Sequence, residues 1–199
     1  MKIAESFLAL VKRASTDLDV EEIRGAVSRF SSRHDGLPTR GKALLMVDGT
    51  ARRAALVGAA AAAPPGWASL AATAPEVSTL VVLQSRMIVG LHLLYGADLD
   101  PEERALEIVA GLAAGAGLSV GRRVTVSVAE ELAVRLAARA LGRSVAHLVP
   151  LAGVAASAAL NYAAVRSVGR AVLARVERRW GPPEIPGRGT VLDAEGRVA

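Results

Sequence analysis

The chain has 199 residues, a formal net charge of +5 and no cysteine. Its length suits one domain with a real core, and the absence of cysteine excludes disulfides, thiol nucleophiles and cysteine-ligated metals. Apolar residues make up 52 % of the chain but aromatic residues only 3 %, so the core must be built from alanine, valine and leucine. This composition favours helices that approach one another closely.

The N-terminal third predicts helices separated by clear breaks. Residues 3–14 form a short amphipathic pattern. Because this stretch lacks a long apolar region and a cleavage site, it does not predict a secretory signal, and we expect a cytoplasmic protein. Asp19 is the predicted N-cap of a second helix that ends near Arg33. A third helix is predicted over residues 39–63, before the Pro64-Pro65-Gly66 break.

The middle of the chain carries the clearest helix-end signals. A helix is predicted over residues 75–95, with Gly96 as its C-terminal stop. Asp100 precedes Pro101 and is the predicted N-cap of a helix over residues 101–114. These patterns predict helix rather than strand throughout this part of the chain.

Two further helices complete the prediction. One covers residues 123–140, and the last begins near Ser144, is bent or divided by Pro150, and ends at Trp180. Residues 181–199 are rich in proline and glycine and predict a flexible, disordered tail. The expected fold is therefore all-α, a single compact bundle of about six to seven helices over residues 1–180.

Residues 145–165 contain no formal charge and are about as long as a membrane-spanning helix. They also include Pro150, Asn161 and many small residues, which suit close contact between helices. The run is therefore open to three interpretations: buried core, oligomer interface or lipid-inserted segment. Of these, we favour helix packing over exposure to lipid.

No pattern predicts a catalytic or cofactor site. Gly111, Gly115 and Gly117 lack the strand and spacing of a phosphate-binding loop and are better explained by helix ends and close packing. His34, His92 and His147 are scattered, without the partners that a metal site needs. We therefore expect a protein that is not an enzyme, without metal or cofactor.

Arg86 is the only formal charge between Val77 and Ala97. A charge in an apolar helix must reach the surface or find a partner, since burying it alone is costly. Glu130 and Glu131 are the partners that we expect, with helix-terminal carbonyl groups as the alternative. Contact with an anionic ligand or head group is the functional interpretation.

A basic cluster follows the uncharged run, with Glu177 as the one nearby acid. Such charges complement the dipole at a helix C-terminus, and they also suit contact with anionic lipid or a partner. Trp180 fits an anchor at a membrane interface. The residues of this predicted contact are Arg166, Arg170, Arg175, Arg178, Arg179 and Trp180. The chain lacks the aromatic platforms and motifs of nucleic-acid binders, so we expect no nucleic-acid partner.

Three stretches in order resemble the EcsC family of bacterial helical proteins. Residues 55–75 (ALVGAAAAAPPGWASLAATAP) resemble its glycine- and alanine-rich segment followed by a break, and residues 80–104 (LVVLQSRMIVGLHLLYGADLDPEER) resemble its long helix ending in tyrosine-glycine. Residues 149–170 (VPLAGVAASAALNYAAVRSVGR) resemble its Pro-x-x-Gly entry to a basic helix. The resemblance implies a helical, membrane-associated protein linked to transport or secretion, and it implies no catalytic residues.

These observations predict a non-enzymatic helical protein, peripheral to the inner face of the cell membrane, that binds anionic lipid or a membrane-protein partner. Two alternatives stay open. The chain is either a soluble module for interaction or homo-oligomerisation, or an integral membrane protein that spans with residues 75–95 and 145–165.

Overall fold

The computed structural model describes residues 15–62, 73–118 and 150–181, together with the single residues 9, 13 and 131. These residues form five helices and no strand, so the described part of the chain is all-helical, as its alanine-rich composition predicts. The helices predicted over 3–14 and 123–140, the Pro64-Pro65-Gly66 break and the tail lie outside the described residues, apart from isolated positions.

The first two described helices have the predicted ends. Helix α2 (Val20–Arg33) is capped by Asp19, whose carboxylate accepts a hydrogen bond of 2.9 Å from the Glu22 N–H. Helix α3 (Thr39–Ala62) begins directly after Pro38. Both boundaries agree with the sequence within one residue, because the caps act locally and do not depend on tertiary packing.

Helix α5 (Thr73–Leu94) begins two residues before its predicted start at Pro75 and ends one residue before its predicted end, and α6 (Pro101–Gly115) begins at its predicted residue. Gly96 has a φ of +76°, and the Ala97 N–H donates to the His92 carbonyl group at 2.9 Å, which is the hydrogen-bond pattern of a glycine-ended helix. Asp100 accepts from the N–H groups of Glu102 and Glu103 at 2.9 Å each. The predicted N-cap and C-terminal stop are both confirmed.

Helix α8 (Pro150–Trp180) is a single helix of 31 residues. Pro150 is its first described residue, and the helix runs from there to Trp180. The residues just before Pro150 lie outside the described ranges, so the predicted bend or division at this proline stays a prediction.

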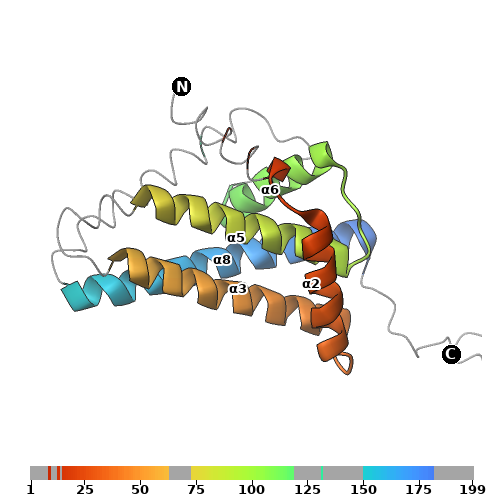
Figure 1. Cartoon of the computed structure of the whole chain (residues 1–199), viewed down its shortest axis with the longest axis horizontal. Helices are drawn as coiled ribbons and strands as arrows, with labels where there is room; N and C mark the ends of the chain where they lie inside the picture. Colours follow the sequence, from red (N-terminus) through yellow and green to blue (C-terminus); the bar gives the residue numbers. More distant parts are fainter. Residues whose placement is uncertain are drawn as a thin grey trace, which may run out of the picture.

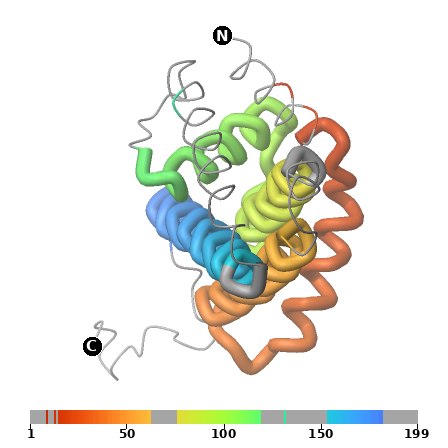
Figure 2. Tube along the Cα trace, turned by 90° about the vertical axis from the view of Figure 1, so that its left-hand side faces the viewer, coloured from red at the N-terminus to blue at the C-terminus, as the bar shows by residue number. Residues whose placement is uncertain are grey.

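Three long helices form the centre of the molecule. Figure 1 shows α3, α5 and α8 running side by side, with α3 antiparallel to the other two. In Figure 2 these three helices are seen nearly end-on, with α2 on one side and α6 on another. Helix α2 packs against α5, and α6 packs against α5 and α8. The core between them is built largely from valine, isoleucine, leucine and alanine.

The described part of the uncharged run packs against α3. Gly153, Ser157, Asn161 and Val165 follow one another at four-residue spacing and are all buried. A Cβ atom on Gly58 of α3 would lie only 2.9 Å from the Ser157 carbonyl oxygen. Over residues 153–165, one face of the run is therefore a helix-packing face, as its small residues predict.

Candidate functional site

A groove opens on the described surface between α2, α3 and α5. Its volume is about 270 Å³, just below the roughly 300–1,000 Å³ that is usual for small-molecule sites. Helix α2 contributes Ile23, Val27 and Phe30 to its lining, and the other two helices contribute Met46 and Met87, among others. The groove is thus predominantly apolar inside.

Two glycines shape the groove. Gly90 lets side chains of α2 and α3 come close to α5. A Cβ at this position would lie 3.2 Å from the Met46 sulfur and 3.5 Å from Val27 Cγ2. Gly49 of α3 lies at the open side, where an added Cβ would meet no heavy atom within 4 Å. A side chain at position 90 would therefore crowd Met46 and Val27, whereas Gly49 leaves the edge of the groove open.

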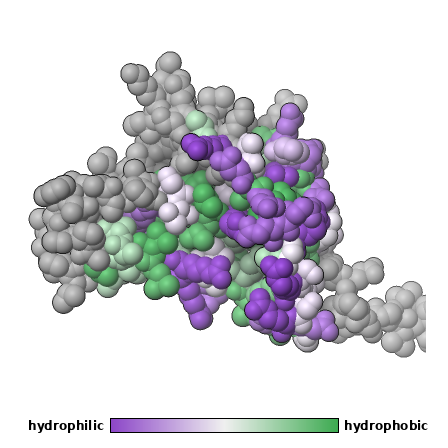
Figure 3. Space-filling view, viewed as in Figure 1, coloured by the Kyte–Doolittle hydropathy of each residue, from purple (hydrophilic) through white to green (hydrophobic). Residues whose placement is uncertain are grey.

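Three arginines complete the lining: Arg33 from α2, Arg53 from α3 and Arg86 from α5. The residues that line the groove include no aspartate, glutamate or histidine. Figure 3 shows hydrophobic side chains that reach the described surface between groups of hydrophilic ones. The groove therefore combines an apolar interior with a positive charge at its edge.

Arg86 has a partner that the sequence did not suggest. Its guanidinium group donates to the Glu22 carboxylate at 3.0 and 2.5 Å, a two-pronged contact between α5 and α2. Glu22 lies 64 positions before Arg86 in the chain, and of the partners that the sequence suggested, Glu130 lies outside the described residues. The hydrogen bonds and charge of Arg86 hold the pKa of Glu22 below its ordinary value.

The other two groove arginines are less engaged. Arg33 donates through Nε to the Arg29 carbonyl oxygen at 3.3 Å, so its terminal nitrogens stay available. Arg53 is exposed, and no ion pair joins it to another described residue. Neither arginine stands out in the sequence, since nothing in the charge pattern of α2 or α3 separates them from ordinary surface arginines.

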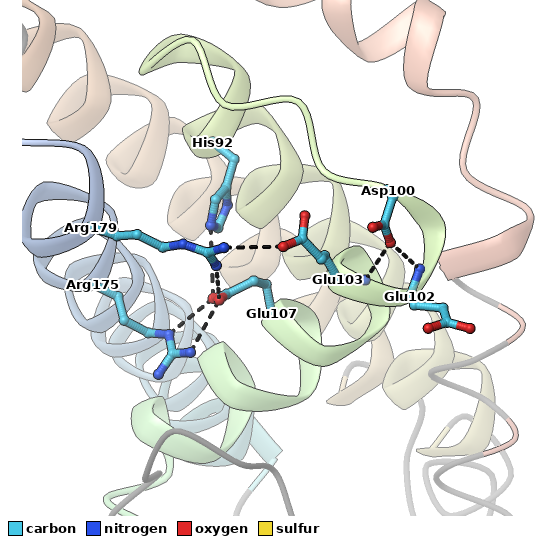
Figure 4. Close-up of polar contacts among 7 residues, drawn as sticks. All are labelled: His92, Asp100, Glu102, Glu103, Glu107, Arg175 and Arg179. Carbon is cyan, nitrogen blue, oxygen red and sulfur yellow. Dashed lines mark hydrogen bonds and ion pairs between the residues drawn. The ribbon is translucent and has the colours of Figure 1, made fainter.

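The basic end of α8 is largely occupied by contacts within the protein. Figure 4 shows Arg175 and Arg179 reaching Glu107 of α6. Arg175 donates to this carboxylate at 2.9 and 3.1 Å, and Arg179 donates to it at 3.4 Å and to Glu103 at 3.1 Å. These ion pairs join α8 to α6, so two of the five predicted contact arginines serve the fold.

His92 lies beside this network and is almost completely buried. Its Nδ1 lies 2.8 Å from the Ile88 carbonyl oxygen, and its Nε2 lies 3.8 Å from Glu107 Oε2. Burial, together with the charges of Arg179 and Arg175, holds the pKa of His92 below its ordinary value, although the Ile88 carbonyl group and Glu107 act in the opposite direction. Burial alone would raise the pKa of Glu107, but the hydrogen bonds and charge of Arg175 hold it below its ordinary value.

Trp180 belongs to the same region. Its ring meets the His92 ring edge-on, with centroids 5.3 Å apart, and Arg179 Cζ lies 4.5 Å from its centroid. About a third of Trp180 stays exposed. The predicted interface anchor thus packs partly onto the protein itself.

The remaining predicted contact residues are on the surface of α8. Arg166, Arg170 and Arg178 are all exposed, and Arg166 lies over the Tyr162 ring at 5.8 Å. Arg86 lines the groove between α2, α3 and α5, to which α8 contributes no lining residue. The structure therefore does not bring the sequence-predicted residues together into one site.

Glycines that resembled a phosphate loop are packing residues. A Cβ on Gly111 would lie 2.6 Å from Val172 Cγ2, and one on Gly115 would collide with Val168. Gly117 ends α6 with a φ of +79°. The close-packing and helix-end explanation is confirmed at these positions.

Within the described ranges no group of three or more histidine, aspartate and glutamate side chains is arranged to hold a metal ion. Glu76–Leu94 is the single described helix segment that is long and apolar enough to cross a membrane, and half of its apolar stretch is buried inside the protein. Core helices of soluble proteins meet the same criterion, so this segment is weak evidence for a span.

Comparison of the chain with protein-family models, curated proteins and solved structures gave no match. The resemblance to the EcsC family therefore stays a prediction, and the groove has to be interpreted from its own chemistry.

Proposed function

We propose that this chain is a non-enzymatic helical protein that binds anionic lipid at the cytoplasmic face of a membrane. The observation that supports it is the groove between α2, α3 and α5, which has an apolar interior and three arginines at its edge. Anionic lipid combines an apolar chain with a negative head group, and each arginine near such a surface contributes about 1 kcal/mol of attraction.

The groove favours binding over catalysis. General acid–base chemistry needs a group that exchanges a proton near neutral pH, and the groove is lined by arginines, one threonine and otherwise apolar or glycine residues. Thr50 donates its hydroxyl hydrogen to the Met46 carbonyl oxygen at 2.9 Å. The lining thus offers charge and apolar surface, which are the properties of a binding site.

The proposal extends to the whole chain. We predict one helical domain over residues 1–180, in which the helices predicted at 3–14 and 123–140 add to the five described ones. Apart from isolated positions, these two predicted helices and the predicted tail over residues 181–199 lie outside the described residues. Membership of the EcsC family agrees with this picture but is not needed for it.

Sedimentation with vesicles tests the proposal. The protein should bind phosphatidylcholine vesicles that contain phosphatidylglycerol, and binding should weaken steeply as salt rises, because surface attraction is screened. The double variant Arg33→Gln/Arg53→Gln should lose about 25-fold in affinity at low salt, from about 1 kcal/mol for each charge. Arg170→Gln/Arg178→Gln is the matched control, with the same change of charge on α8.

Each alternative has its own outcome. No binding to anionic vesicles would contradict lipid binding and favour the soluble module, with the oligomeric state as the next measurement. Equal losses in both double variants would show that net charge matters rather than the groove. In cells, resistance of the membrane-bound protein to carbonate extraction would favour the integral membrane protein.

A further inference from the structure

We infer that the groove between α2, α3 and α5 holds the acyl chain of a fatty acid, with its carboxylate at Arg33 and Arg53. This inference deepens the proposed function by naming the ligand class, and it rests on that function for its preference for a negative head group. The features that support it are the apolar interior, the open edge and the positive charge of the rim.

The interior suits an acyl chain because it is apolar and adaptable. Val27 and Met87 form buried parts of the lining, and Phe30 and Met46 are partly exposed. Methionine side chains are flexible and fill irregular gaps, so they adjust to a chain that bends. A polar ligand would have to give up hydrogen bonds to water here and find few replacements.

The size of the groove favours one chain. Its volume of about 270 Å³ lies just below the usual range for ligand sites. Such a space suits part of a single chain better than a lipid with two chains. The open edge at Gly49, next to the half-exposed Leu45, gives the rest of the chain a path along α3.

The rim favours a negative head group. Arg86 is held by Glu22, so Arg33 and Arg53 are the lining arginines left for a ligand. The guanidinium group matches a carboxylate with two parallel hydrogen bonds. No carboxylate lines the groove, so a cationic amphiphile would be repelled by Arg33 and Arg53.

Methionine methyl groups give a direct probe of the site. The chain has three methionines, Met1, Met46 and Met87, and the last two line the groove. Protein labelled with ¹³C at the methionine methyl groups is titrated with decanoate below its micelle concentration, and Met46→Leu and Met87→Leu variants assign the signals. Decanoate should shift both groove methyl signals.

Gly49 supplies the matched pair of variants. Gly49→Phe places a ring at the open edge, where nothing opposes it within 4 Å of the new Cβ, and should abolish the decanoate shifts. Gly49→Ala also replaces the glycine of the helix but adds little volume, and it should keep the shifts. Should Gly49→Phe fail to fold, the wild-type titration and Gly49→Ala still decide the question. Shifts that persist in a folded Gly49→Phe protein would overturn the inference.

The charge of the ligand is tested with the same signals. Arg33→Gln and Arg53→Gln should each weaken decanoate binding about fivefold, while Arg170→Gln leaves it unchanged. Decyltrimethylammonium should bind at least tenfold more weakly than decanoate. Equal affinity for the two amphiphiles, or tighter binding of lysophosphatidylglycerol than of a fatty acid with the same chain, would overturn the assignment to a fatty acid.

The two proposals fail separately. Binding to anionic vesicles without any decanoate shift at Met46 and Met87 would keep the proposed function and overturn this inference. Decanoate shifts without vesicle binding would support the fatty-acid site and contradict the membrane location.

Discussion

The arginines on the two sides of the central helices differ in how far they are paired with acidic residues. On the side of α6 and α8, Arg175 and Arg179 meet the buried carboxylate of Glu107. On the side of α2, α3 and α5, the groove lining has three arginines and no carboxylate, and only Arg86 is held by an acid, Glu22. We call the first side closed, because its arginines are paired with a carboxylate of the protein. We call the second side open, because Arg33 and Arg53 are not paired with an acid of the groove lining.

Gly111 and Gly49, one on each side, differ in the free space around them. Gly111 on the closed side would bring a Cβ within 2.6 Å of Val172, whereas Gly49 on the open side has free space around it. The density of arginine in a sequence is therefore a poor guide to a binding surface. The partners that an arginine finds after folding decide whether it stabilises the fold or stays available.

The largest effect is expected for Glu107→Gln. This change leaves two arginines without their shared carboxylate, and loss of one member of a buried ion pair typically costs about 3 kcal/mol in the free energy of unfolding. Glu102→Gln is the control, because its side chain is exposed and its backbone N–H makes the contact with Asp100. Urea unfolding measures both variants, and equal stabilities would contradict a structural role for the Glu107 network.

The next effect is expected for Gly111→Ala. The new methyl group would press on Val172 and on Ile88, whose Cδ1 lies 3.0 Å from the added Cβ. Overpacking of this kind costs about 2 kcal/mol. Gly49→Ala should instead stabilise the protein by about 0.5–1 kcal/mol, because alanine favours helix. Thermal unfolding compares the two variants. A change of melting temperature in the same direction in both would contradict the difference in packing between the closed and open sides.

A smaller effect concerns pH. Because the pKa of folded His92 lies below its ordinary value of 6.5, the unfolded chain binds more protons than the folded one as pH falls below 6.5. The lowered pKa of Glu107 acts in the same direction below its ordinary value of 4.5. Stability should therefore fall in acid. Urea unfolding of His92→Asn should show a shallower pH dependence between 6.5 and 5, and an unchanged dependence would contradict this cause.

The sequence predicted the helix ends, which depend only on residues close together in the chain. The Asp19 and Asp100 caps and the Gly96 stop are short-range features, and the structure has all three. It did not predict that Glu22 meets Arg86 or that Glu107 meets Arg175, because these pairs are 64 and 68 positions apart. The groove was missed for the same reason, since its lining comes from three helices.

Glu22→Gln tests how far the two sides differ, with the smallest expected effect. Removing this carboxylate frees Arg86 to meet an anion at the groove, so affinity for decanoate and for anionic vesicles should rise about fivefold. Glu21→Gln makes the same change of charge one residue away, but Glu21 pairs with Arg24 and does not line the groove. A rise with Glu22→Gln alone would show that Arg86 binds an anion once its exposed acidic partner is removed. An equal rise with Glu21→Gln would show that net charge alone controls binding, because Arg24 stays paired with Asp98 at 2.8 Å and no groove arginine is released.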